Sequence, residues 1–333
     1  MEKSADELIS ILCSTLPGDM NRPTNLSGCD FSGKEITGVD FSFINLSRAD
    51  FTDCILKKVN FFKCNLDGSR FDGAEITMCE FTGATLKNSS FNDTHGVETG
   101  FGAVDMTGSR FVGACVRNCT FSKSIIADCD FSMADLYESR MMECRFCGTD
   151  FTNADLRRVN FSFSSFDYTV LRESDLRESS LSYVSDFETA DWFATDFRNI
   201  NFVGAYQLRR FIIDQNYLEE FKRKSFFNRI VFYFWLISSD CGRSMIRWVL
   251  LTVGVALVFS FLYATVAIDY GFHRTWMSPL YFSFVTLTTL GFGDIVPISV
   301  PAQVLVIIEV LTGYGLLGGA LAIFSNKIAR RGD

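Results

Sequence analysis

Residues 41–75 read FSFINLSRADFTDCILKKVNFFKCNLDGSRFDGAE, and a large apolar residue returns there at every fifth position, as at Phe41 and Leu46. The register begins at Leu26 and continues to Leu181, and 31 of its 32 positions are apolar. Composition alone would fill only about half of them, because 48% of the chain is hydrophobic. A period of five matches neither the 3.6-residue period of an α-helix nor the alternation of a β-strand. The pattern therefore predicts a repeat architecture.

Each repeat carries a second signal, a small residue two positions before the large apolar one. The residue between them is often Asp or Asn, as in the ADL triplets at 134–136 and 154–156. This unit resembles the A(D/N)LXX repeat of the pentapeptide-repeat family, and after a one-residue slip it resumes at Phe187 and reaches Phe202. The resemblance implies a right-handed quadrilateral β-helix, here a cytoplasmic β-solenoid of about nine coils over residues 26–204.

The open ends of a solenoid need caps. Ser4 followed by Glu7 matches a capping box, which predicts a short N-terminal capping helix within residues 1–25. A short helix through Leu8, Ile9 and Leu12 is expected to cover the first coil.

The cysteines fit the repeat rather than a metal site. Seven of the 11 occupy its small inward position, which predicts free thiols that fill the core: Cys29, Cys54, Cys64, Cys79, Cys119, Cys129 and Cys144. Cys144 and Cys147 form a CxxC pair, but a zinc site normally needs a second pair. His95 and His273 have no neighbouring ligand set. We therefore predict no cofactor.

Two long apolar stretches follow the repeats. Residues 248–268 contain no charged residue, and Glu309 is the only charged residue in 300–324. Each stretch is also long enough to cross a ~30 Å hydrocarbon core as a helix. Between them, a shorter apolar segment predicts a re-entrant pore helix over 278–288, with Ser278 as its N-cap. The C-terminal region is therefore expected to be an all-α two-transmembrane domain, residues 248–333.

The loop after this short helix, residues 288–294, reads TTLGFGD and resembles the TVGYGD signature of potassium channels. The resemblance implies a selectivity filter over 289–294 in which backbone carbonyls replace the hydration shell of K+. The implied ion-binding residues are Thr289, Leu290, Gly291, Phe292 and Gly293, with K+ at the first four. Four copies of the loop must meet, which implies a homotetramer. Phe292 replaces the usual Tyr and lacks its hydroxyl.

Three further residues are candidates by the same resemblance. Asp294 is expected at the outer mouth, where a ring of carboxylates concentrates cations, or alternatively in a buried hydrogen bond. Glu309 is expected to support the filter by a hydrogen bond to the loop, with a cation site as the alternative. Gly313 matches the family's gating hinge, although a glycine also permits close helix packing.

The distribution of charge indicates how the chain sits in a membrane. The net charge of −8 divides into −12 before residue 205 and +4 after it. Arg274 is the only basic residue between the two spans. The other basic residues near the spans all flank them on the opposite side: Lys222, Arg223, Lys224, Arg229, Arg243, Arg247, Lys327, Arg330 and Arg331. The positive-inside rule then predicts a multi-pass protein of the plasma (inner) membrane, of prokaryotic type, with both termini cytoplasmic. A linker over 205–247 is expected to contain an amphipathic interfacial helix at 230–238, with a helix that packs at the end of the solenoid as the alternative.

These features predict a potassium-selective ion channel with a cytoplasmic pentapeptide-repeat domain that regulates gating or assembly. The permeant ion is K+, the expected partners are the lipid bilayer and three further copies of the chain, and nucleic acid is not expected. A nonselective cation channel is one alternative. A membrane-anchored pentapeptide-repeat binding or scaffold protein is the other. No nucleophile elbow, paired catalytic His or metal cluster points to an enzyme.

Overall fold

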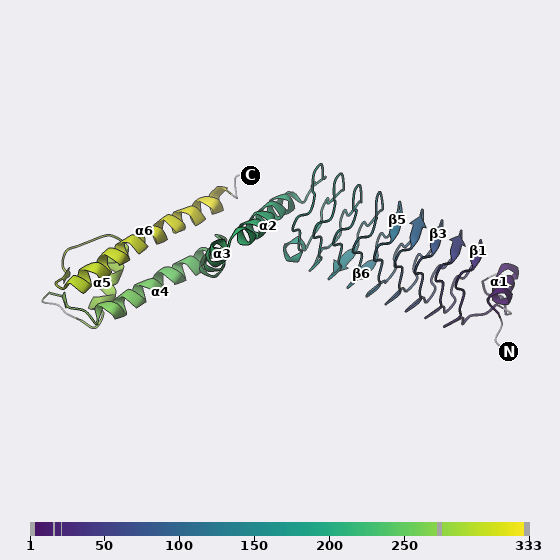
Figure 1. The fold of residues 1–333 in the computed structure, drawn as a ribbon, viewed down its shortest axis with the longest axis horizontal. Coiled ribbons are helices and arrows are strands. Elements are labelled where there is room, and N and C mark those ends of the chain that lie inside the picture. Colours follow the sequence, from purple (N-terminus) through teal and green to yellow (C-terminus); the bar gives the residue numbers. More distant parts are fainter. Residues whose placement is uncertain (1–3, 16, 21, 272–274, 330–333) are drawn as a thin grey trace. The chain divides into compact units, whose positions relative to one another are not determined.

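The computed structural model describes the chain except residues 1–3, 16, 21, 272–274 and 330–333. The chain forms two compact units, residues 1–219 and residues 220–333. Figure 1 shows stacked coils in the first unit and helices in the second.

The first unit is a solenoid whose coils pair at a spacing of 20 residues. Parallel bridges begin with Asn25 and Asn45 and end with Ser180 and Asn201. The three-residue strands β1 to β5 form one parallel sheet and β6 and β7 another: β1 (Glu35–Thr37), β2 (Ile55–Lys57), β3 (Glu75–Thr77), β4 (His95–Val97), β5 (Cys115–Arg117), β6 (Ile125–Ala127) and β7 (Arg145–Cys147). The predicted β-solenoid of pentapeptide repeats is confirmed.

Phenylalanine rings fill the interior of the solenoid in ladders. The rings of Phe31 and Phe51, one coil apart, stack with centroids 5.0 Å apart and planes 8° from parallel. Phe41 and Phe61 stack in a second ladder at 5.2 Å, and the two ladders meet edge to face. All four side chains are fully buried. Aromatic pairs favour both stacked and edge-to-face geometries. The repeat therefore places each ring in favourable contact with rings of the same coil and of the next coil.

The coil turns at a fixed position of each repeat. The residue two places after the large apolar one has a positive φ, for example 66° at Gly33, 55° at Asp53 and 54° at Lys58. Its N–H donates to a carbonyl of the next coil, as from Gly33 to Thr52 at 2.9 Å. The left-handed conformation thus closes each corner without losing a backbone hydrogen bond.

The one-residue slip predicted near Phe187 is confirmed. Val170 pairs with Asp191, a spacing of 21 residues. The extra residue is absorbed where Asp186 adopts a left-handed conformation before the 3-10 helix η1 (Phe187–Thr189). Trp192 is then fully buried again.

Helices lie at both ends of the solenoid. In α1 (Ala5–Ser14) the Ser4 hydroxyl accepts the Glu7 N–H at 3.3 Å, and Leu8 and Leu12 are buried in the solenoid core. At the other end α2 (Tyr206–Lys224) buries Leu208 and Ile212 in the same core.

The start of α2 is a cap that the sequence patterns did not predict, since residues 205–247 were expected to be a linker. The Gln215 side chain accepts the Trp192 N–H at 2.7 Å and donates to the Ala190 carbonyl at 3.1 Å. Asn216 accepts from Ala194 and donates to Trp192. These two amides replace the hydrogen bonds that a further coil would have made.

The second unit contains the helices α3 (Phe226–Ser239), α4 (Met245–Tyr263), α5 (Ser278–Leu287) and α6 (Val300–Ala329) and a strand pair, β8 (Ile268–Asp269) with β9 (Val296–Pro297). Helix α4 starts earlier than the predicted residue 248 because the Ser244 hydroxyl caps it by accepting the Arg247 N–H. It also ends before the predicted residue 268, because Ile268 pairs with Pro297 in the strand pair. The charge-free stretch in the sequence therefore located the apolar segment but did not predict the residues at which the helix begins and ends.

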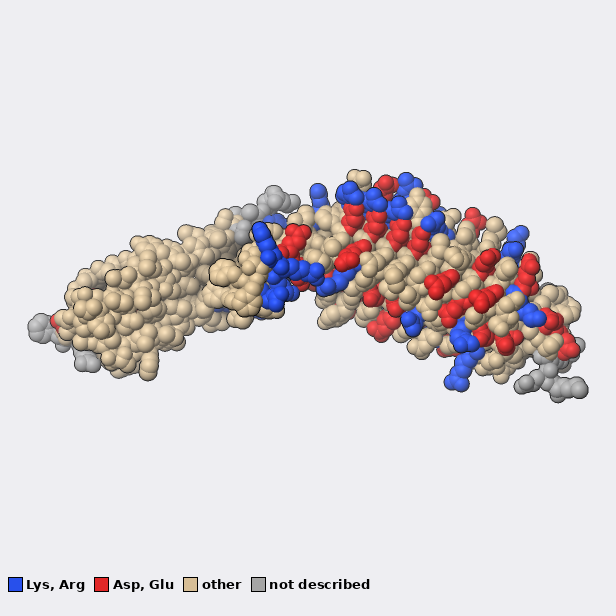
Figure 2. All heavy atoms as spheres, in the orientation of Figure 1, with Lys and Arg blue, Asp and Glu red and all other residues tan. Residues whose placement is uncertain are grey.

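Among the residues of this unit that the structure describes, two helices are long and apolar enough to cross a membrane. They are residues 245–263, with a mean hydropathy of 2.1, and residues 300–325, with 2.0. On the face shown in Figure 2, charged side chains cover the solenoid, whereas the surface of α4 to α6 is almost free of them.

Candidate functional site

The candidate pore loop follows a short helix. Helix α5 begins at Ser278 with Pro279 in its first turn, and its N-cap is Met277. The predicted Ser278 N-cap is wrong by one residue, because the Ser278 hydroxyl instead accepts the N–H of Thr275 at 2.8 Å. At the other end Thr288 is the C-cap, so the helix stops one residue before the predicted end.

The backbone of the loop alternates in hand. Thr289, Gly291 and Gly293 have φ angles of 56°, 54° and 77°, whereas Leu290 and Phe292 are not among the residues with positive φ. In a β-strand successive carbonyls point to opposite sides. Alternation between left- and right-handed residues instead turns successive carbonyls toward one side. Glycine makes this inexpensive at Gly291 and Gly293 because it has no Cβ.

The side chains of the loop are exposed in the single chain. Leu290 is 62% exposed and Phe292 is 65% exposed. Asp294 is exposed as well.

Glu309 is completely buried in α6. Its carboxylate accepts from the Tyr263 hydroxyl of α4 at 2.5 Å and from the Ser283 hydroxyl of α5. The expected hydrogen bond to the filter loop is therefore replaced by bonds to two helices. The reason is position, since Ser283 lies in the second turn of α5, well before the loop. The carboxylate ties α4, α5 and α6 together, and sequence reasoning did not identify Tyr263 and Ser283 as its partners.

Gly313 is a packing position. A Cβ at this residue would lie 2.1 Å from the Leu287 carbonyl oxygen, at the end of α5. Thr289 and Gly313 line the same cavity of about 370 Å³, together with Trp248 and Phe284. The structure thus brings the first filter residue and Gly313 together, while Glu309 lies outside this cavity.

A second glycine of α6 packs against α4. A Cβ at Gly319 would lie 2.1 Å from the ring of Trp248, whose indole N–H donates to the Leu316 carbonyl at 2.9 Å. By contrast, Cβ atoms at Gly315 and Gly318 would meet nothing within 4 Å. Trp248 of α4 thus contacts α6 at Leu316 and Gly319.

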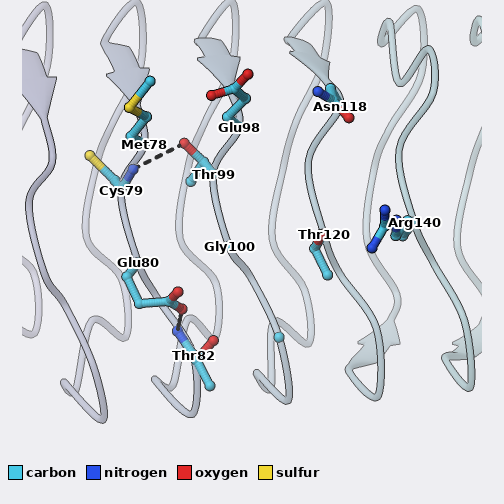
Figure 3. A pocket seen from close by; sticks show the side chains of 11 residues that line it. Met78, Cys79, Glu80, Thr82, Glu98, Thr99, Gly100, Asn118, Thr120 and Arg140 are labelled. Carbon is cyan, nitrogen blue, oxygen red and sulfur yellow. Dashed lines mark hydrogen bonds between the residues drawn. The ribbon is translucent and has the colours of Figure 1, made fainter.

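A hollow of about 480 Å³ also lies on the solenoid, where Gly100 and Gly102 carry no side chains (Figure 3). Two of the polar side chains that line it form hydrogen bonds within the coils. The Glu80 carboxylate accepts the Thr82 N–H at 2.8 Å, and the Thr99 hydroxyl accepts the Cys79 N–H at 3.4 Å.

The cysteines and His95 do not converge on a site. Cys144 is buried, whereas Cys147 is exposed on the surface, so the CxxC pair points in two directions. His95 is exposed in β4. His273 lies outside the described residues.

Comparison with known families assigns both units. Residues 248–330 match the family described as "Ion channel". Residues 24–101 match "Pentapeptide repeat region", and residues 124–162 and 154–185 match "Pentapeptide repeats". This chain joins pentapeptide repeats to an ion-channel domain. Neither kind of region is an enzyme.

One curated relative and two solved structures illustrate the similarity. The calcium-gated potassium channel TvoK of Thermoplasma volcanium is 33% identical over 70 residues, which are 20% of this chain and 20% of that protein. The chain thus spans about a fifth of the length of this relative. HetL, a pentapeptide repeat protein from the cyanobacterium Nostoc sp. strain PCC 7120, is 17% identical, with 60% of this chain and 95% of that one covered and a TM-score of 0.25. QnrB1, a plasmid-mediated fluoroquinolone resistance protein, is 17% identical, with 54% and 94% covered and a TM-score of 0.38.

Proposed function

We propose that this protein is a potassium-selective channel built from four copies of the chain, with the filter formed by residues 289–293. The alternating φ angles of that loop carry the proposal. A cation must lose its water to pass a narrow filter, and inward carbonyl oxygens replace the lost ligands. The ion-channel domain and the potassium-channel relative support the same reading.

A single loop supplies ligands from only one side of an ion. Four loops around an axis supply a complete ring, and the exposed side chains of Leu290 and Phe292 then become subunit contacts. Asp294, one residue beyond the loop, contributes a ring of carboxylates at the outer mouth, which raises the local cation concentration. Both termini lie in the cytoplasm, where the positive-inside rule places the basic flanks of α4 and α6.

The reversal potential of the purified full-length protein in planar bilayers tests this function. With unequal K+ on the two sides and Na+ replacing the difference, the current reverses near the K+ equilibrium potential, which changes by about 59 mV for a tenfold change in the K+ ratio. Current that reverses near zero contradicts potassium selectivity.

A nonselective cation channel is the second candidate, and Phe292 favours it. The usual Tyr at this position donates a hydrogen bond behind the filter, and Phe lacks the hydroxyl. If wild type reverses near zero, the variant Phe292→Tyr separates the two cases. A shift of its reversal potential toward that of K+ supports a loosened filter as the cause.

The solenoid is proposed to bias the open–closed equilibrium of α6 or to support assembly. A partner of the solenoid changes gating only if it binds one state more tightly. Deletion of residues 1–219 tests this role, because residues 205–219 belong to the solenoid unit and would otherwise leave Leu208 and Ile212 uncovered. Unchanged open probability and an unchanged tetramer would exclude both roles.

A further inference from the structure

Helix α3 carries an apolar stripe whose side chains are about half exposed or more in the described part of the chain. Its side chains recur every three or four residues and form what we call the aromatic stripe: Phe226, Phe227, Ile230, Tyr233, Phe234 and Ile237. Their exposed fractions range from 48% at Tyr233 to 76% at Ile237. On the other side of the helix Phe232 and Trp235 are half-buried. Water is an unfavourable neighbour for so much contiguous apolar surface.

Cations surround the stripe. Between residues 222 and 247 the only acidic residue is Asp240, against six basic ones: Lys222, Arg223, Lys224, Arg229, Arg243 and Arg247. Lys224 and Arg229 are exposed. The Lys222 ammonium lies 5.5 Å from the centre of the Phe232 ring, which draws the end of α2 against α3. An apolar face bordered by positive charge is complementary to a surface that is apolar inside and negative outside.

A hydrogen-bonded corner fixes α3 to the helix that follows it. Five residues, 240–244, separate α3 from α4. Asp240 and Cys241 are left-handed, with φ of 53° and 52°, and their N–H groups return to the last turn of α3. The Ser244 N–H donates to the Ser239 carbonyl at 2.8 Å, and Arg247 pairs with Asp240 across the corner at 3.8 Å. The stripe is therefore held at the end of a helix long and apolar enough to cross a membrane.

We propose that the aromatic stripe of α3 and its flanking cations bind anionic phospholipids of the membrane surface. The apolar side chains enter the boundary between headgroups and acyl chains, and Lys224 and Arg229 meet the phosphates. This inference rests on the proposed membrane function. It adds the chemical class of a lipid partner to that function and names the residues that recognise it.

Lipid retention by the purified full-length protein in detergent tests the proposal. Native mass spectrometry compares bound phosphatidylglycerol with bound phosphatidylcholine when both are offered equally. Wild type retains phosphatidylglycerol in preference. The double variant Lys224→Gln/Arg229→Gln loses about fivefold in preference for each cation removed, or about 25-fold together.

A matched control separates a site from bulk charge. Lys58→Gln/Arg110→Gln removes two exposed cations from the solenoid and leaves the preference at the wild-type value. If the α3 variant and the control behave alike, or if wild type shows no preference, the proposal is wrong. Excess inorganic phosphate leaves the preference unchanged, because phosphate has no acyl chain for the stripe. Displacement of the lipid by phosphate would overturn the proposal in favour of a free-anion site.

The stripe itself is tested by Phe226→Ser/Ile237→Ser, which we expect to lower total lipid retention while the oligomer persists. Dissociation of that variant into single chains would instead make the stripe a subunit contact and reject the proposal. The readout is independent of conduction. Lipid preference with a current that reverses near zero would refute the proposed potassium selectivity alone, whereas K+-selective current without lipid preference would refute this inference alone.

Discussion

The residue that closes each corner of the solenoid is set by backbone geometry rather than by contacts. Gly38 has a φ of 67°, and a Cβ there would meet nothing within 4 Å. Its replacement therefore isolates the cost of the left-handed conformation. Equivalent corners accept Asp53 and Lys58, so the position tolerates side chains that are not branched at Cβ.

Gly38→Val is expected to destabilise the solenoid by about 1–2 kcal/mol, because a β-branched residue is disfavoured at positive φ. Gly38→Asn is the control, since Asn enters this region readily. Thermal unfolding of the full-length protein followed by circular dichroism measures both. Equal losses for Val and Asn would show that the backbone conformation is not the cause.

The thiols offer a second test at this scale. Burial raises the pKa of the Cys54 thiol to about 11 and that of Cys144 to about 12, whereas Cys13 and Cys147 are exposed. The thiolate is the reactive form. With a thiol reagent at neutral pH we expect rapid labelling of Cys13 and Cys147 and labelling of Cys54 and Cys144 only on unfolding. Rapid labelling of Cys144 in the native protein would contradict its place in the core.

Sequence patterns were informative about residues that repeat and poor for residues that do not. The inward position of Cys54 or Cys144 follows from the register of the repeat. Many repeats fix that register, so one repeat that deviates does not change the prediction. Glu309 occurs once, and its partners Tyr263 and Ser283 lie 46 and 26 residues away. No local period connects them, so the sequence predicted a buried carboxylate that needs a donor but not the donors.

The carboxylate of Glu309 accepts hydrogen bonds from two neighbouring helices of the second unit. Glu309→Ala leaves the Tyr263 hydroxyl without its acceptor, at a cost of about 1–3 kcal/mol for that buried group, whereas the Ser283 hydroxyl keeps the Ala256 carbonyl at 2.9 Å as an acceptor. We expect lower thermal stability and, in the proposed channel, weaker potassium selectivity because α5 is no longer held. Glu309→Gln keeps one acceptor oxygen and is expected to fall between the two. Unfolding in detergent and reversal potentials measure the two effects, and a fully stable Ala variant would contradict this role of the carboxylate.

At the scale of elements, two glycines allow α6 to pack closely against its neighbouring helices, because they have no Cβ. Gly313 rests on the Leu287 carbonyl and Gly319 lies under Trp248. The sequence showed four glycines in this stretch and favoured Gly313 as a hinge. It could not show which glycines are in contact, because that depends on how α6 is rotated against α4 and α5. Gly315 and Gly318, which meet nothing in the single chain, have more freedom to bend.

This packing predicts different effects for two glycines. Gly319→Val drives Cβ into the Trp248 ring and is expected to separate the lower part of α6 from α4, which destabilises the helical unit by about 1–3 kcal/mol. Gly318→Val has open space in the single chain and is the matched control. The midpoint of thermal unfolding compares the two variants. A larger loss at Gly318 would indicate that it packs against a neighbouring subunit.

On the scale of the whole molecule, the two units differ most in their carboxylates. Of the 39 Asp and Glu residues, 33 lie in residues 1–219 and 6 in residues 220–333. Several on the solenoid form ion pairs that run from coil to coil. Hydrogen bonds from Arg177 lower the pKa of Asp175, and those from Arg198 lower the pKa of Asp196, below the ordinary value of 3.8.

The sign of the resulting pH dependence follows from linkage. A carboxylate whose pKa is lower in the folded state stabilises that state fully above its unfolded pKa, and the contribution disappears as the pH falls through the folded pKa. The solenoid therefore loses stability in acid, below about pH 4. Each exposed pair contributes little, so the effect is a sum over many coils.

We therefore expect two calorimetric transitions for the full-length protein in detergent, of which only one moves with acid. Between neutral pH and about pH 3, the transition of the solenoid shifts to lower temperature, because protonation removes charge from Asp175, Asp196 and their counterparts. The transition of residues 220–333 stays nearly constant, because few carboxylates are present there. Arg177→Ala reduces the size of the shift, since the pKa of Asp175 then returns toward its ordinary value. If both transitions moved together with pH, the two units would unfold cooperatively. Binding of a partner to the solenoid would then act on α6 through this shared unfolding equilibrium and not through a separate gating contact.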